Sequence, residues 1–234
     1  LLSLPLLVAA LALCSDWLLT SMAIPIFPTL HASTFATGAL FSAKALVQLL
    51  TAPVVSLLSN GRVPLLALLM CGLLIDIASA TGFCLSHTYW IWLIMRGIQG
   101  FASSALTAGG LGQLSHHYAD HPERRSEAMG LAIAGLLLGV TAGPPIGGLL
   151  YGWSPPAPFI FVGIVQVIAL ALAIVLRCQQ GDTVKEDQAE GQWMVLIQDF
   201  TVAAPLMVVL MTNVAISFLE ASIGIYAEDN FGFS

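Results

Sequence analysis

The sequence predicts an all-α integral membrane protein, a bundle of about seven transmembrane helices. Hydrophobic residues make up 58% of its 234 residues, only 9% are charged, and the mean hydropathy is +0.91. An average soluble domain carries roughly 25% charged residues. The apolar residues form continuous runs of about 20 residues, the length that a helix needs to cross a bilayer. A membrane β-barrel would instead show alternating segments of about ten residues.

Seven runs of this kind follow one another along the chain. They cover residues 2–27, 38–58, 64–84, 90–114, 127–151, 158–176 and 201–226.

The basic residues outside these runs lie in every second connection. Arg62 falls between the second and third runs, Arg124 and Arg125 between the fourth and fifth, and Arg177 and Lys185 between the sixth and seventh. Because lysine and arginine accumulate in cytoplasmic loops, these three connections are predicted to be cytoplasmic. The chain then enters its first span from the cytoplasm.

Two acidic residues lie deep inside predicted spans, Asp16 in the first and Glu220 in the seventh. A carboxylate in hydrocarbon is costly, so such groups face a protein interior or a water cavity and mark functional sites. We therefore interpret both as functional acids. The alternative is an acid held by neighbouring hydroxyl groups that serves packing alone. Asn213 precedes Glu220 by seven residues and shares nearly the same helical face.

The second span carries Lys44 in its interior, with Phe41 and Gln48 on the same helical face. Lysine at this depth is too far from the cytoplasmic surface to extend its ammonium group there. Snorkelling to the opposite surface is the alternative to a partner inside the bundle.

The fourth span has a polar stripe that begins with an arginine. The stripe consists of Arg96, Gln99, Gly100, Ser103 and Thr107. Because a guanidinium stays charged, Arg96 needs a carboxylate or several carbonyl groups around it. We expect it to form a charge network with Lys44 and Gln99. Either the network takes part in function directly, or it is a structural ion pair that joins helices.

Two further residues in the spans, Asp76 and Trp17, each leave two interpretations open. Asp76 in the third span either has a function or pairs with a neighbouring polar group. Trp17 could offer its ring to a cation, although we favour a position facing lipid. The sixth span is nearly featureless apart from Gln166, so we expect it to face lipid along much of its length.

The fifth span contains a stripe of glycines at intervals of four residues, followed by one more glycine and interrupted by two prolines. The stripe is Gly135, Gly139, Gly143 and Gly147, the further glycine is Gly148, and the prolines are Pro144 and Pro145. Small residues at this spacing let two helices approach closely, and a double proline bends a helix. We expect a packing surface on a bent helix, with packing alone as the simpler interpretation.

Residues 177–199 form the longest polar segment and divide the chain. We predict a six-helix bundle at residues 1–176, a cytoplasmic linker at 177–199, and the first helix of a second bundle at 200–234. The chain is interpreted as part of a longer protein.

No motif points to a cofactor, a metal or a nucleic acid. The four cysteines lack CxxC spacing. His116, His117 and His121 lie in a charged connection, where a solvated loop explains them better than a metal site. An enzyme is not expected, because no nucleophile and base are paired.

Three segments resemble the major facilitator superfamily, specifically its drug:proton antiporter branch and the vesicular amine transporters within it. The segment RGIQG at 96–100 resembles the fourth-span signature, GVTAGPPIGG at 139–148 the antiporter motif, and FSAKALVQL at 41–49 the second span of the vesicular amine carriers. The resemblance extends over nearly the whole chain. It implies a major facilitator-type bundle with twelve spans in two six-helix halves, of which seven are present here.

The resemblance also implies roles for residues of this chain. Positions similar to Asp16 and Glu220 recognise the amine and couple it to protons, and those similar to Asn213 and Phe41 line the pocket. Lys44 and Arg96 match membrane bases that support the network, the lysine pairing with an aspartate of the second half.

The function predicted from these features is proton-coupled antiport of an organic cation, an amine or a cationic drug, by alternating access. The protein would lie in the plasma membrane or an intracellular vesicle membrane. The alternatives are a facilitator or symporter of a neutral solute, against which the glycine–proline pattern argues, and a truncated membrane protein that does not transport.

Overall fold

A computed structural model describes residues 3–23, 26, 34–59, 63–180 and 211. The chain divides into two compact units, Leu1–Gln188 and Ala189–Ser234. The helices discussed below belong to the first unit. The seventh predicted span, with Asn213 and Glu220, and most of the predicted linker lie outside the described residues, so the predicted domain boundaries stay predictions.

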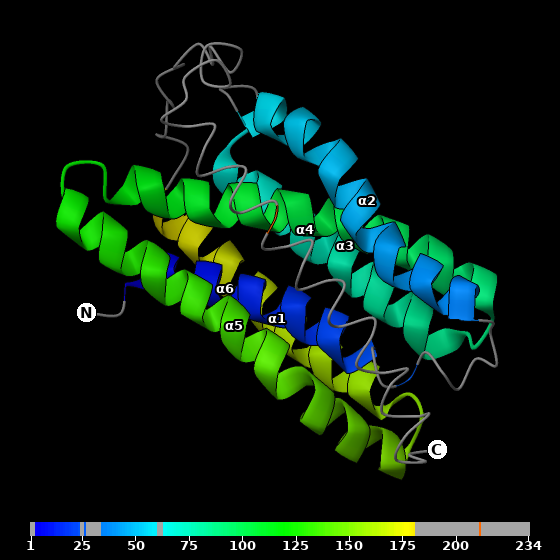
Figure 1. The fold of residues 1–234 in the computed structure, drawn as a ribbon. Helices are drawn as coiled ribbons and strands as arrows, with labels where there is room; N and C mark the ends of the chain where they lie inside the picture. The colour runs from blue at the N-terminus through cyan, green and yellow to red at the C-terminus, as the bar shows by residue number, and fades with distance from the viewer. Residues whose placement is uncertain (1–2, 24–25, 27–33, 60–62, 181–210, 212–234) are drawn as a thin grey trace. The chain divides into compact units, whose positions relative to one another are not determined.

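Six helices match the first six apolar runs, and successive helices run in opposite directions (Figure 1). They are α1 (Leu4–Ala23), α2 (Thr34–Ser59), α3 (Leu65–Leu85), α4 (Tyr89–His117), α5 (Pro122–Trp153) and α6 (Ala157–Gln180). In the described part of the chain, all of them except α4 are long and apolar enough to cross a membrane, which makes five candidate spans. The helical membrane bundle is thus confirmed in its class, although not in its count of seven spans.

Several helices extend beyond the apolar runs that predicted them. Helix α5 starts at Pro122, where proline occupies the first turn and needs no hydrogen-bonding partner for its nitrogen. Helix α6 continues through Arg177 to Gln180, past the predicted end of the bundle at residue 176. Arginine and glutamine are good helix formers. The backbone therefore stays helical where the apolar run ends.

Helix α1 occupies the centre of the first unit. It packs against α5, α6 and α4, while α2 packs on α4, and α3 on α4 and α6. In the most apolar stretch of 18 residues, 67% of α1 is buried, compared with 17% of both α2 and α5. A polar residue of α1 is therefore enclosed by other helices.

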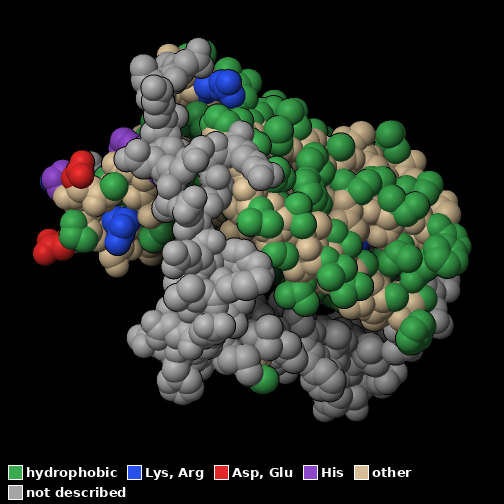
Figure 2. Space-filling model, turned by 90° about the horizontal axis from the view of Figure 1, so that it is seen from above, with side chains coloured by type: hydrophobic (Ala, Val, Ile, Leu, Met, Phe, Trp, Pro, Cys, Tyr) green, Lys and Arg blue, Asp and Glu red, His purple; other side chains and the backbone are tan. Residues whose placement is uncertain are grey.

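The two ends of the first unit differ in charge. The start of α1, the α4–α5 turn and the end of α6 lie at one end, and the α3–α4 and α5–α6 connections lie at the other (Figure 1). The described bases Arg124, Arg125 and Arg177 thus share one end, and the cytoplasmic side of this end stays a prediction. On the face shown in Figure 2, hydrophobic side chains cover most of the described surface and most charged side chains gather at one end. Exposed leucine, isoleucine and valine side chains on α2, α5 and α6 suit contact with lipid.

The glycine stripe of α5 is a packing surface against α1. A Cβ added at Gly135 would lie 2.9 Å from the carbonyl oxygen of Ala10, one at Gly139 would meet that of Cys14, and one at Gly143 would meet the Ser21 hydroxyl. Ser21 Oγ in turn donates to the carbonyl oxygen of Gly139 at 2.9 Å. The helices approach this closely because the stripe has no side chains.

The two prolines and the last glycine of this motif face away from α1. Pro144, Pro145 and Gly148 are exposed, and a Cβ at Gly148 would have no neighbour within 4 Å. Gly147 belongs to the packed face, where its added Cβ would lie 3.0 Å from Met22 Cα. Both prolines lie inside a continuous α5.

Replacing Gly143 by leucine is expected to destabilise the bundle while the chain still inserts into the membrane. Because the new side chain collides with Ser21, α5 must move away from α1, which costs about 1–3 kcal/mol as in other overpacked cores. The thermal unfolding midpoint of the purified protein measures the loss. Gly148→Leu is the matched control on the same helix and should unfold close to the wild type. Equal midpoints for both variants would show that the α1–α5 contact does not depend on the stripe.

Candidate functional site

Asp16 lies at the centre of a buried polar network that joins α1, α2 and α4. Its side chain is 1% exposed. Lys44 Nζ on α2 lies 3.1 Å from Asp16 Oδ1, which makes an ion pair. Ser103 Oγ on α4 lies 2.8 Å from both carboxylate oxygens and can donate to either. The carboxylate is thus held by one cation and one neutral donor, as a buried charge requires.

Lys44 is enclosed by the bundle and does not extend to a membrane surface. The residue is 5% exposed. Besides Asp16, its ammonium group donates to the hydroxyl of Thr20 and lies 4.8 Å from the centre of the Trp17 ring. Our preference for a lipid-facing Trp17 was therefore wrong, because the side chain is half-buried and presents its ring to a cation.

Thr20 connects the ion pair to the polar stripe of α4. Gln99 Nε2 donates to Thr20 Oγ1 at 3.2 Å, and the hydroxyl of Thr20 donates to the carbonyl oxygen of Asp16 at 2.9 Å. The prediction from sequence missed Thr20. Its position four residues after Asp16, and so on the same helical face, could have identified it.

Arg96, near the N-terminal end of α4, extends this network through its guanidinium group. Its Nη1 donates to Gln99 Oε1 at 2.8 Å and its Nη2 to the carbonyl oxygen of Thr20 at 3.1 Å. The guanidinium carbon lies 5.7 Å from the centre of the Phe83 ring. Arg96 and Gln99 thus lie in one hydrogen-bonded network with Lys44, through Thr20.

Close packing of α2 on α4 brings Lys44 within reach of Asp16. A Cβ added at Gly100 would meet the carbonyl oxygen of Lys44 and lie 3.1 Å from the backbone nitrogen of Gln48. A larger residue at position 100 would therefore push α2 outward. Gly100, which follows Gln99 in the RGIQG segment, is required for this approach.

The remaining predicted site residues are placed less centrally. Phe41 is half-buried and packs against a core cluster that includes Leu40, Phe83 and Trp92. Asp76 lies apart from the ion pair and accepts a hydrogen bond from Gln166. Asn213 and Glu220 lie outside the described residues, so their predicted roles stay predictions. The exposed imidazoles of His116, His117 and His121 lie at the α4–α5 turn.

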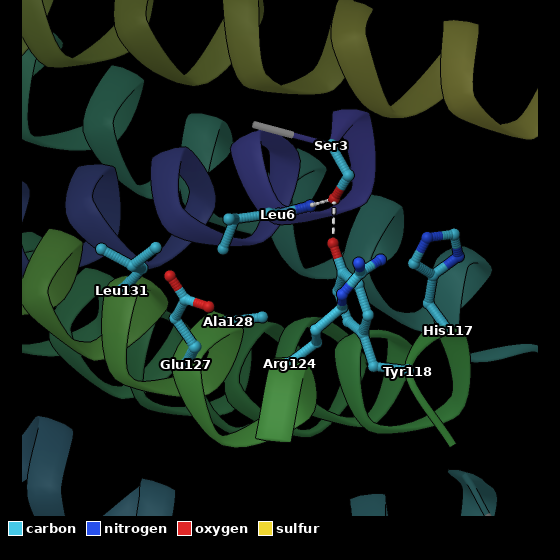
Figure 3. Close-up of a pocket in the computed structure, with 8 residues that line it drawn as sticks. All are labelled: Ser3, Leu6, His117, Tyr118, Arg124, Glu127, Ala128 and Leu131. Carbon is cyan, nitrogen blue, oxygen red and sulfur yellow. Dashed lines mark hydrogen bonds between the residues drawn. The ribbon is translucent and has the colours of Figure 1, made fainter. Parts of the chain in front are cut away.

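A cavity of about 430 Å³ lies at the α4–α5 turn and does not include the network (Figure 3). Ser3, Tyr118 and Arg124 are among its lining residues, and Ser3 Oγ lies 2.6 Å from the Tyr118 hydroxyl. None of the residues that surround Asp16 lines this cavity. The polar network around Asp16 is therefore separate from this cavity.

Comparison with known proteins identifies the family. The sequence profile described as Major Facilitator Superfamily matches residues 6–234. A synaptic vesicular amine transporter from Bos taurus is 35% identical over 191 residues, which cover 81% of this chain and 36% of the relative. A vesicular acetylcholine transporter from Drosophila melanogaster is 31% identical over 222 residues, 91% of this chain and 37% of the relative. A chromaffin granule amine transporter from Homo sapiens is 31% identical over 194 residues, with 81% and 36% covered.

The resemblance predicted from sequence is thus confirmed, including its relation to vesicular amine carriers. The chain spans little more than a third of the length of these relatives. The match to the family covers almost all of the chain and agrees with a bundle of long apolar helices. The protein is therefore a multi-pass membrane protein that belongs to the major facilitator superfamily.

Proposed function

We propose that the protein exchanges protons for an organic cation, an amine or a cationic drug, by alternating access. The observation that carries this proposal is the environment of the Lys44 ammonium group. It is a protonated primary amine that contacts the Asp16 carboxylate, the Thr20 hydroxyl and the Trp17 ring inside the membrane region. A protonated amine substrate needs the same three kinds of contact, which are a carboxylate, a neutral acceptor and an aromatic face.

In this proposal Lys44 occupies the cation site when no substrate is bound. An incoming organic cation replaces the lysine ammonium at Asp16 Oδ1, and Ser103 continues to donate to the carboxylate. Because a bare carboxylate is costly inside the membrane, Asp16 keeps a lysine, a substrate or a proton throughout the cycle.

Exchange follows because a proton and a cation compete for the same carboxylate. Protonation removes the charge that holds the substrate, so a proton bound from one side releases the cation. In this proposal the carrier returns only with the proton bound to Asp16, because a return with Lys44 as its partner would let the substrate cross without a proton. This competition couples the flow of protons to the opposite flow of substrate.

The relatives support an organic cation as the substrate class. They are described as transporters of amines or of acetylcholine. By their resemblance to these carriers, Glu220 would serve as a second acid for cation and proton, and Asn213 and Phe41 would line the pocket. Gly139, Gly143 and Gly147, with Pro144, Pro145 and Gly148, would allow α5 to move against α1. We place the protein in a vesicle membrane or the plasma membrane.

An uptake screen in proteoliposomes tests the proposal. The complete gene product is reconstituted, a pH gradient is imposed, and accumulation of amines and cationic dyes is followed against neutral solutes of similar size. Only the cations should accumulate, and an ionophore that collapses the gradient should stop their uptake. Equal uptake of neutral solutes with and without the gradient would contradict exchange and favour a facilitator.

A further inference from the structure

A second buried acid lies outside the Asp16 network, between α3 and α6. Asp76 on α3 and Gln166 on α6 are both 0% exposed. Gln166 Nε2 donates to Asp76 Oδ2 at 2.6 Å. This contact joins the two helices through side chains that are 90 positions apart in the chain.

Each of these two side chains also has an oxygen without a partner. In the part of the chain that the structure describes, Asp76 Oδ1 and Gln166 Oε1 are buried and make no hydrogen bond. A buried polar atom without a partner is destabilising, because it has lost its hydrogen bonds to water and gained none in return. The two orphaned atoms are both acceptors, and they belong to the two groups that are already joined by the other hydrogen bond.

One proton can satisfy both orphaned oxygens. A carboxylic acid and a primary amide have complementary groups: the amide donates to the carbonyl oxygen of the acid, and the acid hydroxyl donates to the amide oxygen. Exchanging the positions of the amide nitrogen and oxygen of Gln166 does not remove the need for a proton. The amide oxygen would then face Asp76 Oδ2, and both of these atoms are acceptors.

We propose that Asp76 and Gln166 form a proton-binding site, in which protonated Asp76 donates from Oδ1 to Gln166 Oε1. The bound proton turns the carboxylate into a carboxylic acid, and no other bond is formed or broken. The ligand is the proton itself. The proposal does not depend on cation exchange at Asp16.

The two buried acids of the described bundle differ in what surrounds them. Asp16 has an ammonium group and a hydroxyl as donors, which stabilise an ionised carboxylate. Asp76 has a single amide donor. The other charged side chains buried in the described bundle are Asp16 of α1, Lys44 of α2 and Arg96 of α4. Burial and the two oxygens without partners favour a proton bound between Asp76 and Gln166.

Infrared spectroscopy of the complete gene product in an ester-free detergent at neutral pH tests the site. A protonated carboxyl group has a carbonyl stretch that a carboxylate lacks. The wild type should show such a band, and Asp76→Asn should lose it. Glu127→Gln is the control, because it also replaces an acid by its amide but at an exposed position of α5, and it should keep the band.

Gln166→Leu provides a second measurement that does not require the Asp76 variant to fold. Since Asp76 Oδ2 then loses its Nε2 donor, the carbonyl band should shift to higher wavenumber. A wild-type spectrum without the protonated band, or a band that neither Asp76→Asn nor Gln166→Leu changes, would overturn the proposal. Both readouts are taken without a gradient, so a failure of proton-driven uptake would leave them intact.

Discussion

Asp16→Asn is expected to abolish gradient-driven uptake of organic cations. The amide keeps the shape of the side chain and removes the charge that holds Lys44 Nζ at 3.1 Å and, in our proposal, the substrate. Truncating one partner of a buried charge pair costs roughly 2–5 kcal/mol of binding free energy. At about 1.4 kcal/mol per factor of ten, the affinity falls by about 30-fold or more. Radiolabelled binding and uptake, measured side by side in proteoliposomes, test this.

The same experiment gives the direction of the pH dependence. In the wild type, the apparent affinity should weaken as the pH falls on the binding face, because protons compete with the cation for Asp16. The Asp16→Asn variant has no such competition, so any binding that remains should not change between about pH 5.5 and 8. Glu220→Gln is expected to abolish gradient-driven uptake as well.

Glu127→Gln is the control for the loss of an acid. Glu127 is an exposed residue of the first turns of α5, and its variant should take up cations like the wild type. Full proton-driven uptake by Asp16→Asn and by Glu220→Gln would show that neither acid carries the coupling. The assignment would then pass to Asp76 or to residues outside this chain.

Lys44→Met is expected to destabilise the bundle strongly and to make its stability depend on bound substrate. The variant leaves Asp16 buried without its cation, which costs about 3–5 kcal/mol in comparable pairs. An organic cation that binds Asp16 would restore part of this loss. The thermal unfolding midpoint should therefore fall in the variant and rise further with added amine than it does in the wild type.

A double variant separates the ion pair from side-chain packing. Asp16→Asn with Lys44→Met removes both charges, so its stability should recover part of what either single variant loses. Arg177→Met, at an exposed base of the last turn of α6, controls for the loss of a positive charge and should unfold like the wild type. If the double variant were as unstable as the sum of the two single ones, the ion pair would contribute no coupling energy.

The membrane class and the positions of the first six helices could be predicted from sequence because their signal is local. A run of about 20 apolar residues has few alternatives to a membrane helix, since its backbone must be satisfied within the segment. The ends of the helices were less predictable. At Pro122 and Gln180 the helix extends into polar sequence, where the membrane no longer decides the structure.

The individual residues of the candidate site could be predicted, but the contacts between them could not. The depth of Asp16, Lys44 and Arg96 in their spans indicated that each needs a partner inside the bundle. The resemblance implied that Lys44 pairs with an aspartate of the second half. In the structure it contacts Asp16, because the close approach of α2 to α4 at Gly100 brings the two side chains together.

The sequence by itself therefore determined that charged groups lie in the membrane and that α5 carries a small-residue face, since composition and helical period are properties of one segment. Only the tertiary structure decided which helix fills each face. The glycines of α5 receive α1, and Gln166, in a span expected to face lipid, is the partner of Asp76. Such partners depend on the rotation and depth of two helices that are far apart in the chain. Close packing of the whole bundle sets both quantities, and no single segment encodes them.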